Sequence, residues 1–360
     1  MGEVCDVIGG STPKTSEESY WGGEHYWISP AELDGSKYVY STSRTITDAG
    51  IKSAHLQMLP VGTVLLSSRA PIGKVAITKV PMYCNQGFKN LVCKNEVLNE
   101  FVYWFLLHNT EYLNSLGTGA TFKEISKRVV EQVSISIPSI AEQEKIVAEL
   151  DCLSGIIEKK KQQLKELEAL AQSIFYEMFG DPVENEKGWE VKRLGEVAYD
   201  IFAGGDKPKD ISYVQTDEYS YPVYANGDGD RGLLGFSKKF RVESKAVTIG
   251  ARGASVGNCR ICNEKFTPVV RLITIIPSPN LDIVFLYYYV LQIEWDINGA
   301  GQAQLTTPNV INKSIYLPPL SLQHSFASKV EAIEKQKELI KQSIAETELL
   351  FNSRMQYYFG

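Results

Sequence analysis

Residues 135–143 read ISIPSIAEQ, and residues 315–323 read IYLPPLSLQ. In each stretch, proline stands just before a long segment whose apolar residues recur at helical spacing. Proline suits the first turn of a helix and not its interior. The two stretches therefore predict the starts of two long helices, which end in the similar sequences SIFYEMFG at 173–180 and SRMQYYFG at 353–360.

Both predicted helices carry a heptad seam, with spacings that alternate between four and three residues. The first seam consists of Ile146, Leu150, Leu153, Ile157, Lys160, Leu164, Leu167, Ala171, Ile174 and Met178. The second consists of Phe326, Val330, Ile333, Lys337, Ile340, Ile344, Thr347, Phe351, Arg354 and Tyr358. An apolar seam that repeats every ~3.5 residues needs a partner helix in a coiled coil. We expect the two helices to pair with each other, with the lysines at Lys160 and Lys337 as a possible means of fixing the register.

The sequence before each helix is also written twice. GEVCDVIGGSTPK begins at Gly2 and GEVAYDIFAGGDKPK at Gly195, and two further pairs follow in the same order: LSSRAPIG at 66–73 with IGARGASVG at 249–257, and LGTGA at 116–120 with NGAGQ at 298–302. Both copies contain short apolar runs that are broken by glycine, proline and other turn residues. This pattern predicts two similar globules of mixed α/β structure with several short strands. Each has one predicted helix near its end, at 98–116 and 281–297.

Connectivity predicts the direction of the long helices. Only a short linker, residues 181–189, separates the first helix from the second globule, so the second helix must run back along the first. The expected fold class is α+β, with two mixed α/β domains joined by an antiparallel coiled coil and related by a pseudo-twofold internal repeat. The expected boundaries are 1–139 and 181–319 for the two domains, and 140–180 and 320–360 for the helices.

Positive charge is concentrated at matching places in the two copies, although the whole chain has a formal net charge of −6. Residues 49–95 contain lysines and arginines but no acidic residue, and residues 231–271 are strongly basic apart from Glu243 and Glu264. Locally concentrated positive charge is typical of phosphate binding. The alternative is an ordinary solvated surface whose acidic partners come from elsewhere in the fold.

Other patterns argue against an enzyme, a membrane protein or a metalloprotein. The chain contains no phosphate-loop, dinucleotide-binding or zinc-protease motif, and none of its four histidines recurs in the other copy. No apolar run reaches the roughly 18 residues of a membrane helix. Cys259 and Cys262 form a C-x2-C pair, but no second pair completes a zinc site, so they are expected to be small apolar residues of a strand. We expect no cofactor, no metal, no membrane partner and a cytoplasmic location with reduced thiols.

Several motifs together resemble the DNA-specificity subunit of type I restriction–modification systems. They are GEV with GGSTPK, the segment YW…YWISPAEL, SSRAPIGKVAI, a G-x-G-A before a strand, and IPSIAEQEKI at the start of a long helix. The resemblance implies that each globule is a target-recognition domain for half of a split site in double-stranded DNA. It also implies that the helices dock two methyltransferase subunits and the restriction (translocase) subunits, without catalysis by this chain. The W-x-x-x-x-L lead at Trp189–Leu194 is missing from the first copy, which predicts a shortened opening strand there.

Phosphate contacts position a protein on DNA and base contacts specify the sequence. Residues that recur in both copies are therefore candidates for phosphates or close backbone approach, and residues that differ are candidates for bases. The recurrent candidates are Lys14 with Lys209, Arg69 with Arg252, and Gly119 with Gly301. The remaining candidates in the DNA-binding set are Tyr20, Trp21, Lys74, Lys89, Lys123, Tyr224, Asn226, Arg231, Arg271, Gln302 and Gln304. Asn and Gln suit adenine, and Arg or Lys suits guanine.

Structural roles remain open for most of these residues. The arginine pair could instead form salt bridges that brace the hairpins, the two glycines could simply mark turns, and Tyr20 and Trp21 could belong to the core. Two other functions also stay open at this point. One is a scaffold that binds two identical proteins and no nucleic acid, and the other is an enzyme with one site in each globule.

Overall fold

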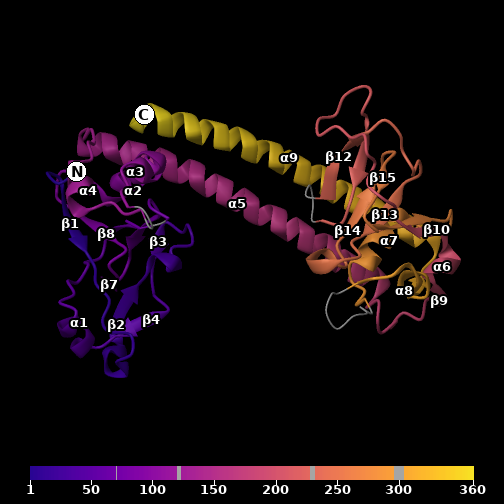
Figure 1. Cartoon of the computed structure of the whole chain (residues 1–360), viewed down its shortest axis with the longest axis horizontal. Coiled ribbons are helices and arrows are strands. Elements are labelled where there is room, and N and C mark those ends of the chain that lie inside the picture. Colours follow the sequence, from indigo (N-terminus) through magenta and orange to yellow (C-terminus); the bar gives the residue numbers. More distant parts are fainter. Residues whose placement is uncertain (70, 120–122, 228–231, 296–303) are drawn as a thin grey trace. The chain divides into compact units, whose positions relative to one another are not determined.

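The computed structural model describes residues 1–360 except 70, 120–122, 228–231 and 296–303. The chain divides into two compact units. Unit 1 comprises residues 1–160 and 343–360, and unit 2 comprises residues 161–342. Two 40-residue helices, α5 (Ile140–Phe179) and α9 (Leu320–Phe359), contribute to both units (Figure 1).

Unit 1 contains two sheets and four short helices. The larger sheet has the order β1 (Cys5–Gly9), β8 (Lys89–Cys93), β5 (Val64–Leu66), β6 (Val75–Thr78) and β3 (Tyr38–Val39). The smaller has the order β4 (Arg44–Ile46), β2 (Trp21–Ile28) and β7 (Tyr83–Cys84). The helices are α1 (Asp48–Ser53), α2 (Asn99–His108), α3 (Thr110–Ser115) and α4 (Lys127–Gln132).

Unit 2 repeats this plan with one addition. Its larger sheet has the order β10 (Ala198–Ala203), β16 (Ile273–Pro277), β13 (Ala246–Ile249) and β14 (Cys259–Cys262). Its three-stranded sheet has the order β12 (Leu233–Ser237), β11 (Tyr221–Tyr224) and β15 (Thr267–Pro268), and a strand pair joins β17 (Ser314–Leu317) to β9 (Glu190–Arg193). The helices are α6 (Leu194–Val197), α7 (Ile283–Val290) and α8 (Thr307–Ile311).

The pairing of the strands establishes the internal repeat. In both units a central strand lies antiparallel to two neighbours, β5 to β6 and β8 in unit 1 and β13 to β14 and β16 in unit 2. In both smaller sheets one strand pairs antiparallel on one side and parallel on the other. The duplicated mixed α/β architecture predicted from the sequence is confirmed.

The long helices run antiparallel in each unit, because residues with higher numbers on α5 contact residues with lower numbers on α9. In unit 1, Glu149 forms an ion pair with Arg354 at 2.7 Å, and Lys160 hydrogen-bonds to Ser343. In unit 2, Lys337 lies 3.5 Å from Glu168, and the rings of Phe175 and Phe326 are 5.5 Å apart. The two lysines in the seam therefore have polar partners at the helix interface.

The core of each unit joins a short helix to the sheet and to the long helices. In unit 1, Phe101, Val102 and Leu106 of α2 are buried with residues of both α5 and α9. In unit 2, Phe285 of α7 packs between Phe175 and Phe179 of α5, at ring distances of 5.7 and 4.8 Å. Each globule is thus anchored to the long helices by apolar packing.

Two local predictions need comment. The single helix expected at 98–116 is broken into α2 and α3 at Asn109, whose side chain donates to the carbonyl of Phe105 at 2.9 Å. The helix expected at 281–297 is shorter: α7 ends at Val290, and residues 296–297 lie outside the described part of the chain. No strand pair equivalent to β9 and β17 occurs among the described residues of unit 1.

Candidate nucleic-acid interface

The repeated arginines lie at the same place in both folds, on the tight loop that joins two core strands. In unit 1 the loop is closed by Ser67, whose hydroxyl donates to the carbonyl of Pro71 and accepts from the amide of Lys74, both at 2.8 Å. In unit 2 the loop closes through glycine, since a Cβ atom on Gly250 would stand 2.0 Å from the carbonyl oxygen of Ser255. Each loop therefore presents its arginine from a fixed backbone.

In unit 1 the arginine is neutralised by an acid. Arg69 forms a backbone bridge with Glu124, and its Nε lies 2.8 Å from the Glu124 carboxylate. The ammonium of Lys89 lies 3.2 Å from the same carboxylate and is mostly buried. Partial burial raises the pKa of Glu124, but hydrogen bonds from Lys89 and Arg69 outweigh it and leave the pKa below its usual range. The salt-bridge alternative thus describes Arg69 and Lys89 well.

In unit 2 the equivalent arginine has no acidic partner. Arg252 forms the same kind of backbone bridge, but the residue opposite is Gln304, an uncharged amide. The Arg252 side chain is exposed, and no ion pair to it occurs among the described residues. The same kind of backbone bridge therefore occurs beside both arginines. Arg69 is neutralised by Glu124, whereas Arg252 has no ion pair among the described residues.

A second arginine is held next to Arg252 by the side chain of Asn226. The Asn226 carboxamide accepts from the amide of Ala251 and donates to the carbonyl of Val270, both at 2.7 Å. These two backbone groups directly precede Arg252 and Arg271 in the chain. Asn226 therefore acts as a bracket that brings the two arginine-bearing loops together.

The backbone around Arg271 is strained. Val270 and Arg271 have φ values of 53° and 60°, in the left-handed region that non-glycine residues rarely adopt. Such conformations cost about 1–3 kcal/mol each and are concentrated at functional sites. The amides of Val270 and Arg271 donate to the carbonyls of Gly205 and Gly204, at 2.8 and 3.1 Å, and these bonds hold the turn. Arg271 is exposed and has no ion pair within the described residues.

Tyr224 lies at the edge of the same region in unit 2. Its hydroxyl donates to Glu264 at 2.7 Å, and the guanidinium of Arg260 lies over its ring at 4.4 Å. Burial, and then the hydrogen bond to Glu264, raise the pKa of Tyr224, so the phenol stays protonated at neutral pH. Because the Tyr224 hydroxyl is already hydrogen-bonded to Glu264, the ring face of Tyr224 and the guanidinium of Arg260 are the groups that remain to contact a ligand.

Several candidates in unit 1 have structural partners. Trp21 packs edge-on against Trp27 at 5.0 Å, and the guanidinium of Arg44 lies 3.7 Å from its ring. The Tyr20 carbonyl accepts from the amide of Thr47. The Lys74 ammonium donates to the carbonyl of Leu33 at 2.8 Å. These contacts favour a framework role for all three residues.

The remaining candidates are exposed or undescribed. Lys14, Lys123 and Lys209 are exposed and lack ion pairs among the described residues. Gly119 has a φ of 130°, which side-chain-bearing residues avoid, so its position requires glycine. Arg231, Gly301 and Gln302 lie outside the described residues.

Sequence reasoning missed the residues that decide which arginine is free. Glu124 was not singled out because acidic residues were not considered as candidates. Its equivalence to Gln304 becomes visible only once the two hairpins are aligned, because Glu124 pairs with Arg69 and Gln304 pairs with Arg252. Arg44 and Arg260 were also missed, although both stand in aromatic surroundings that a cation can use.

The chain matches the family model for the type I restriction modification DNA specificity domain over residues 1–169 and again over residues 186–349. The protein belongs to this family. Family membership identifies it as a specificity subunit of a type I restriction–modification system, which implies recognition of DNA sequence.

Relatives and solved structures agree. The chain is 32% identical to the specificity subunit of the type I restriction enzyme MjaIX from Methanocaldococcus jannaschii, over 92% of this chain and 85% of that protein. It is 22% identical to the EcoprrI specificity subunit of Escherichia coli, over 93% and 86% of the two chains. The fold is similar to that of a type I restriction-modification S subunit from M. genitalium, with a TM-score of 0.62, 16% identity and coverage of 100% of this chain and 94% of the other.

Two searches of the described residues found nothing. No group of three or more His, Cys, Asp or Glu side chains could hold a metal ion in the part of the chain that the structure covers. No helix within the described ranges is both long and apolar enough to cross a bilayer.

Proposed function

We propose that the chain reads a bipartite site in double-stranded DNA, with one half read by each recognition domain, and that it does so in the cytoplasm without catalysing a reaction. The domains are residues 1–139 and 181–319, and the spacer helices are 140–180 and 320–360. The observation that carries the proposal is the pair Arg252 and Arg271. These two exposed cations are bracketed by Asn226, lack acidic partners among the described residues, and lie on strained or tightly closed backbone.

The proposed DNA contacts are mainly the exposed cationic side chains that have no ion pair among the described residues. Arg252, Arg271, Lys209 and Gln304 are the proposed contacts in unit 2, with the undescribed Arg231, Gly301 and Gln302 beside them in sequence. Lys14, Lys123 and Gly119 are the corresponding contacts in unit 1. Guanidinium groups bind phosphate and guanine in bidentate geometry, which suits both positioning and base reading.

The rival function, a scaffold for two identical proteins, is favoured by no feature of these loops. A protein partner would need acidic residues of its own to meet Arg252 and Arg271, whereas the phosphates of DNA supply negative charge directly. Family membership adds to the case for DNA.

Selection from a random duplex library tests the proposal. The chain, co-expressed with the methyltransferase subunit of its own system, should enrich a motif of two short fixed segments separated by a gap. Binding should fall steeply with added salt, because neutralised phosphates release counterions. Enrichment of one uninterrupted motif, or no salt dependence, would contradict the bipartite reading.

We further propose that the long helices dock two methyltransferase subunits, to which the restriction subunits add. Leu170 of α5 and Leu350 of α9 support this, because they occupy equivalent places in the two copies and are 46% and 48% exposed. Apolar side chains that lie outside the seam at equivalent positions offer the same contact twice.

Mass photometry of the reconstituted complex tests the docking. We expect one specificity chain with two methyltransferases. Leu170→Asp or Leu350→Asp alone should leave one methyltransferase, and the double variant none. Glu338→Gln on the exposed surface of α9 is the control and should keep two. An unchanged mass in the double variant would place the docking surface elsewhere.

A further inference from the structure

The two larger sheets differ at one edge. In unit 1, β3 covers β6: the amide of Ile77 donates to the carbonyl of Lys37 at 2.8 Å, and the amide of Lys79 donates to that of Val39 at 2.9 Å. All four residues of β6 are buried. In unit 2, no strand pairs with the outer edge of β14 among the described residues, and only Cys262 of its four residues is buried.

The cause lies in the connectors. Strand β3 belongs to residues 29–43, which join β2 to β4 in unit 1. The equivalent connector in unit 2, residues 225–232 between β11 and β12, is about half as long. It offers no described strand to cover β14. An uncovered edge strand leaves unpaired amide and carbonyl groups that can pair with another chain.

The covering segment in unit 1 inserts a cation into an aromatic and acidic cage. The Lys37 ammonium lies over the rings of Trp104 and Tyr103 at 5.0 and 5.5 Å, and it pairs with the carboxylate of Asp151 on α5. The indole of Trp104 donates to the same carboxylate at 2.9 Å. Tyr103 and Trp104 are almost completely buried, with 4% and 3% exposure.

Unit 2 repeats the residue types of this cage, but its acid has a partner on its own helix, since Glu331 forms an exposed ion pair with Lys335 at 2.9 Å, and a cation that enters the groove would have to replace Lys335. The helices are aligned by matching caps, since the amide of Leu98 donates to Gln143 in unit 1 and that of Asp282 donates to Gln323 in unit 2. This alignment puts Tyr287 and Tyr288 at the positions of Tyr103 and Trp104, and the internal repeat puts Glu331 of α9 at the position of Asp151.

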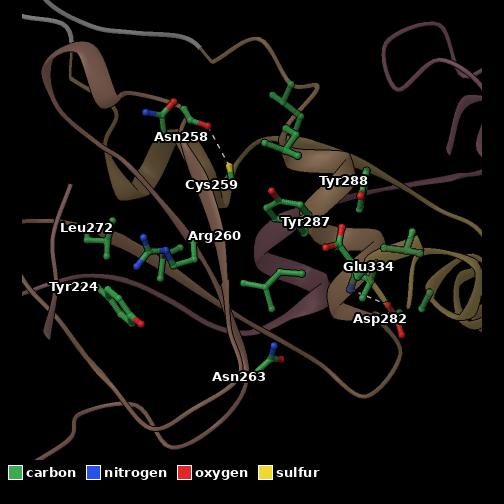
Figure 2. A pocket seen from close by; sticks show the side chains of 18 of the residues that line it. Tyr224, Asn258, Cys259, Arg260, Asn263, Leu272, Asp282, Tyr287, Tyr288 and Glu334 are labelled. Atoms are coloured by element: carbon green, nitrogen blue, oxygen red, sulfur yellow. Dashed lines mark hydrogen bonds between the residues drawn. The ribbon is translucent and has the colours of Figure 1, made fainter. Parts of the chain in front are cut away.

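An open groove lies between β14 and these residues. It has a volume of about 1270 Å³, and Figure 2 shows Tyr287, Tyr288 and Glu334 on its helical side, opposite Arg260 and Tyr224. Both α7 tyrosines are partly exposed here, unlike their counterparts in unit 1. The indole nitrogen of Trp295, another lining residue, is buried without a hydrogen-bond partner.

We propose that this groove binds an extended segment of a partner polypeptide that carries a lysine followed by an aromatic residue. The segment pairs parallel to β14, as β3 pairs with β6, and its ammonium lies over Tyr287 and Tyr288 against Glu331. Main-chain pairing supplies affinity, and the cage supplies selectivity for a cation. Asp282, Glu331 and Glu334 line the groove, Lys337 is paired with Glu334 at 2.9 Å, and Arg260 also lies in the wall. The inference does not rest on the proposed reading of DNA.

The probe is a fluorescein-labelled peptide with the sequence of residues 35–41, GSKYVYS, titrated into the full chain and followed by anisotropy. We expect saturable binding, weakened about fivefold by Glu331→Gln and by a lysine-to-glutamine change in the peptide, as for loss of one ion pair. Ile261→Pro should abolish binding, because it removes an amide equivalent to that of Ile77 from an edge strand, where proline is tolerated. Glu338→Gln on the same helix is the matched control and should bind as wild type.

Circular dichroism checks that Ile261→Pro folds, and Tyr288→Ala, with Tyr288→Phe as its conservative counterpart, provides a second route. The phenylalanine variant should bind the peptide and the alanine variant should not. Three results would overturn the proposal. They are no saturable binding, binding that none of the unit 2 variants changes, and displacement of the peptide by duplex DNA or by a second copy of the chain at equal concentration.

Discussion

The hairpin of β5 and β6 and the hairpin of β13 and β14 carry an arginine at the same point, yet the two arginines have different neighbours. Arg69 faces Glu124, and Arg252 faces Gln304. With an amide in place of the acid, Arg252 is exposed and has no ion pair among the described residues, whereas Arg69 braces the fold through Glu124. A repeated residue therefore need not have a repeated function.

The two sites also differ in how their charges are supported. Lys89 shares the carboxylate of Glu124 in unit 1. At the matching register, unit 2 has the buried Ile273 instead of a lysine, and it adds Arg271 on strained backbone. In unit 1, Arg69 and Lys89 hold a loop through Glu124, whereas in unit 2 Asn226 joins the loops that carry Arg252 and Arg271 and both arginines are exposed. The free charge of unit 2 is thus built into its local structure.

Removing Arg252 and Arg271 together should have the largest effect on DNA affinity. Arg252→Ala combined with Arg271→Ala is expected to weaken DNA binding by about 100-fold, roughly tenfold for each lost contact. The slope of log affinity against log salt should fall by about two. Fluorescence anisotropy with the selected duplex at several salt concentrations measures both quantities.

Arg69→Ala combined with Lys89→Ala is the matched control for that double variant. Because these cations are already paired with Glu124, DNA affinity should change by less than about threefold. An equal loss in the two double variants would remove the distinction between the hairpins.

Placing an acidic residue opposite Arg252 should reduce DNA affinity less than removing both arginines. Gln304→Glu places a carboxylate opposite Arg252, as Glu124 stands opposite Arg69, and DNA affinity is expected to fall about tenfold. Gln304→Asn keeps an uncharged amide and should cost less, so it serves as the control. Equal losses in the two variants would mean that the charge of the side chain at position 304 does not control how well Arg252 binds DNA.

Much of the fold was predictable because its signals are local and periodic. The prolines and the heptad seams predicted α5 and α9, and the order of the repeated landmarks predicted two similar units. The break at Asn109 was not predicted, because it depends on one side chain bonding back to Phe105 within an otherwise helical pattern. The open edge of β14 was readable in principle, from the shorter connector at 225–232.

The candidate site was predicted as a set of loops but not as a set of partners. Asn226 was chosen as a possible adenine contact, yet its amide joins Ala251 to Val270, residues that are distant in sequence. Lys74 and Trp21 were chosen by residue type, and their contacts with Leu33 and Arg44 come from the tertiary fold. Contacts between residues that are distant in the sequence decide which polar side chains are left without a partner. The order of residues in a single sequence does not show these contacts.

The smallest expected effect concerns the stability of unit 1. Glu124→Gln should lower the free energy of unfolding at neutral pH by about 1 kcal/mol, the upper range for partly exposed ion pairs. Because the pKa of Glu124 is lowered in the folded state, its contribution is complete above the ordinary glutamate pKa of about 4.3 and is lost as the pH falls through the folded value. Urea unfolding at pH 7 and at about pH 3 should show the difference shrinking at the lower pH. Gln304→Ala in unit 2 is the control and should show no such pH dependence.

Exchange of one recognition domain tests the central claim most directly. Residues 195–319 would be replaced with the equivalent segment of a relative that has a different site, and the methylated sequence of the reconstituted complex would be mapped across a genome. We expect one half of the bipartite sequence to change and the other half, read by residues 1–139, to stay the same. A change in both halves, or in neither, would contradict separate reading by the two domains.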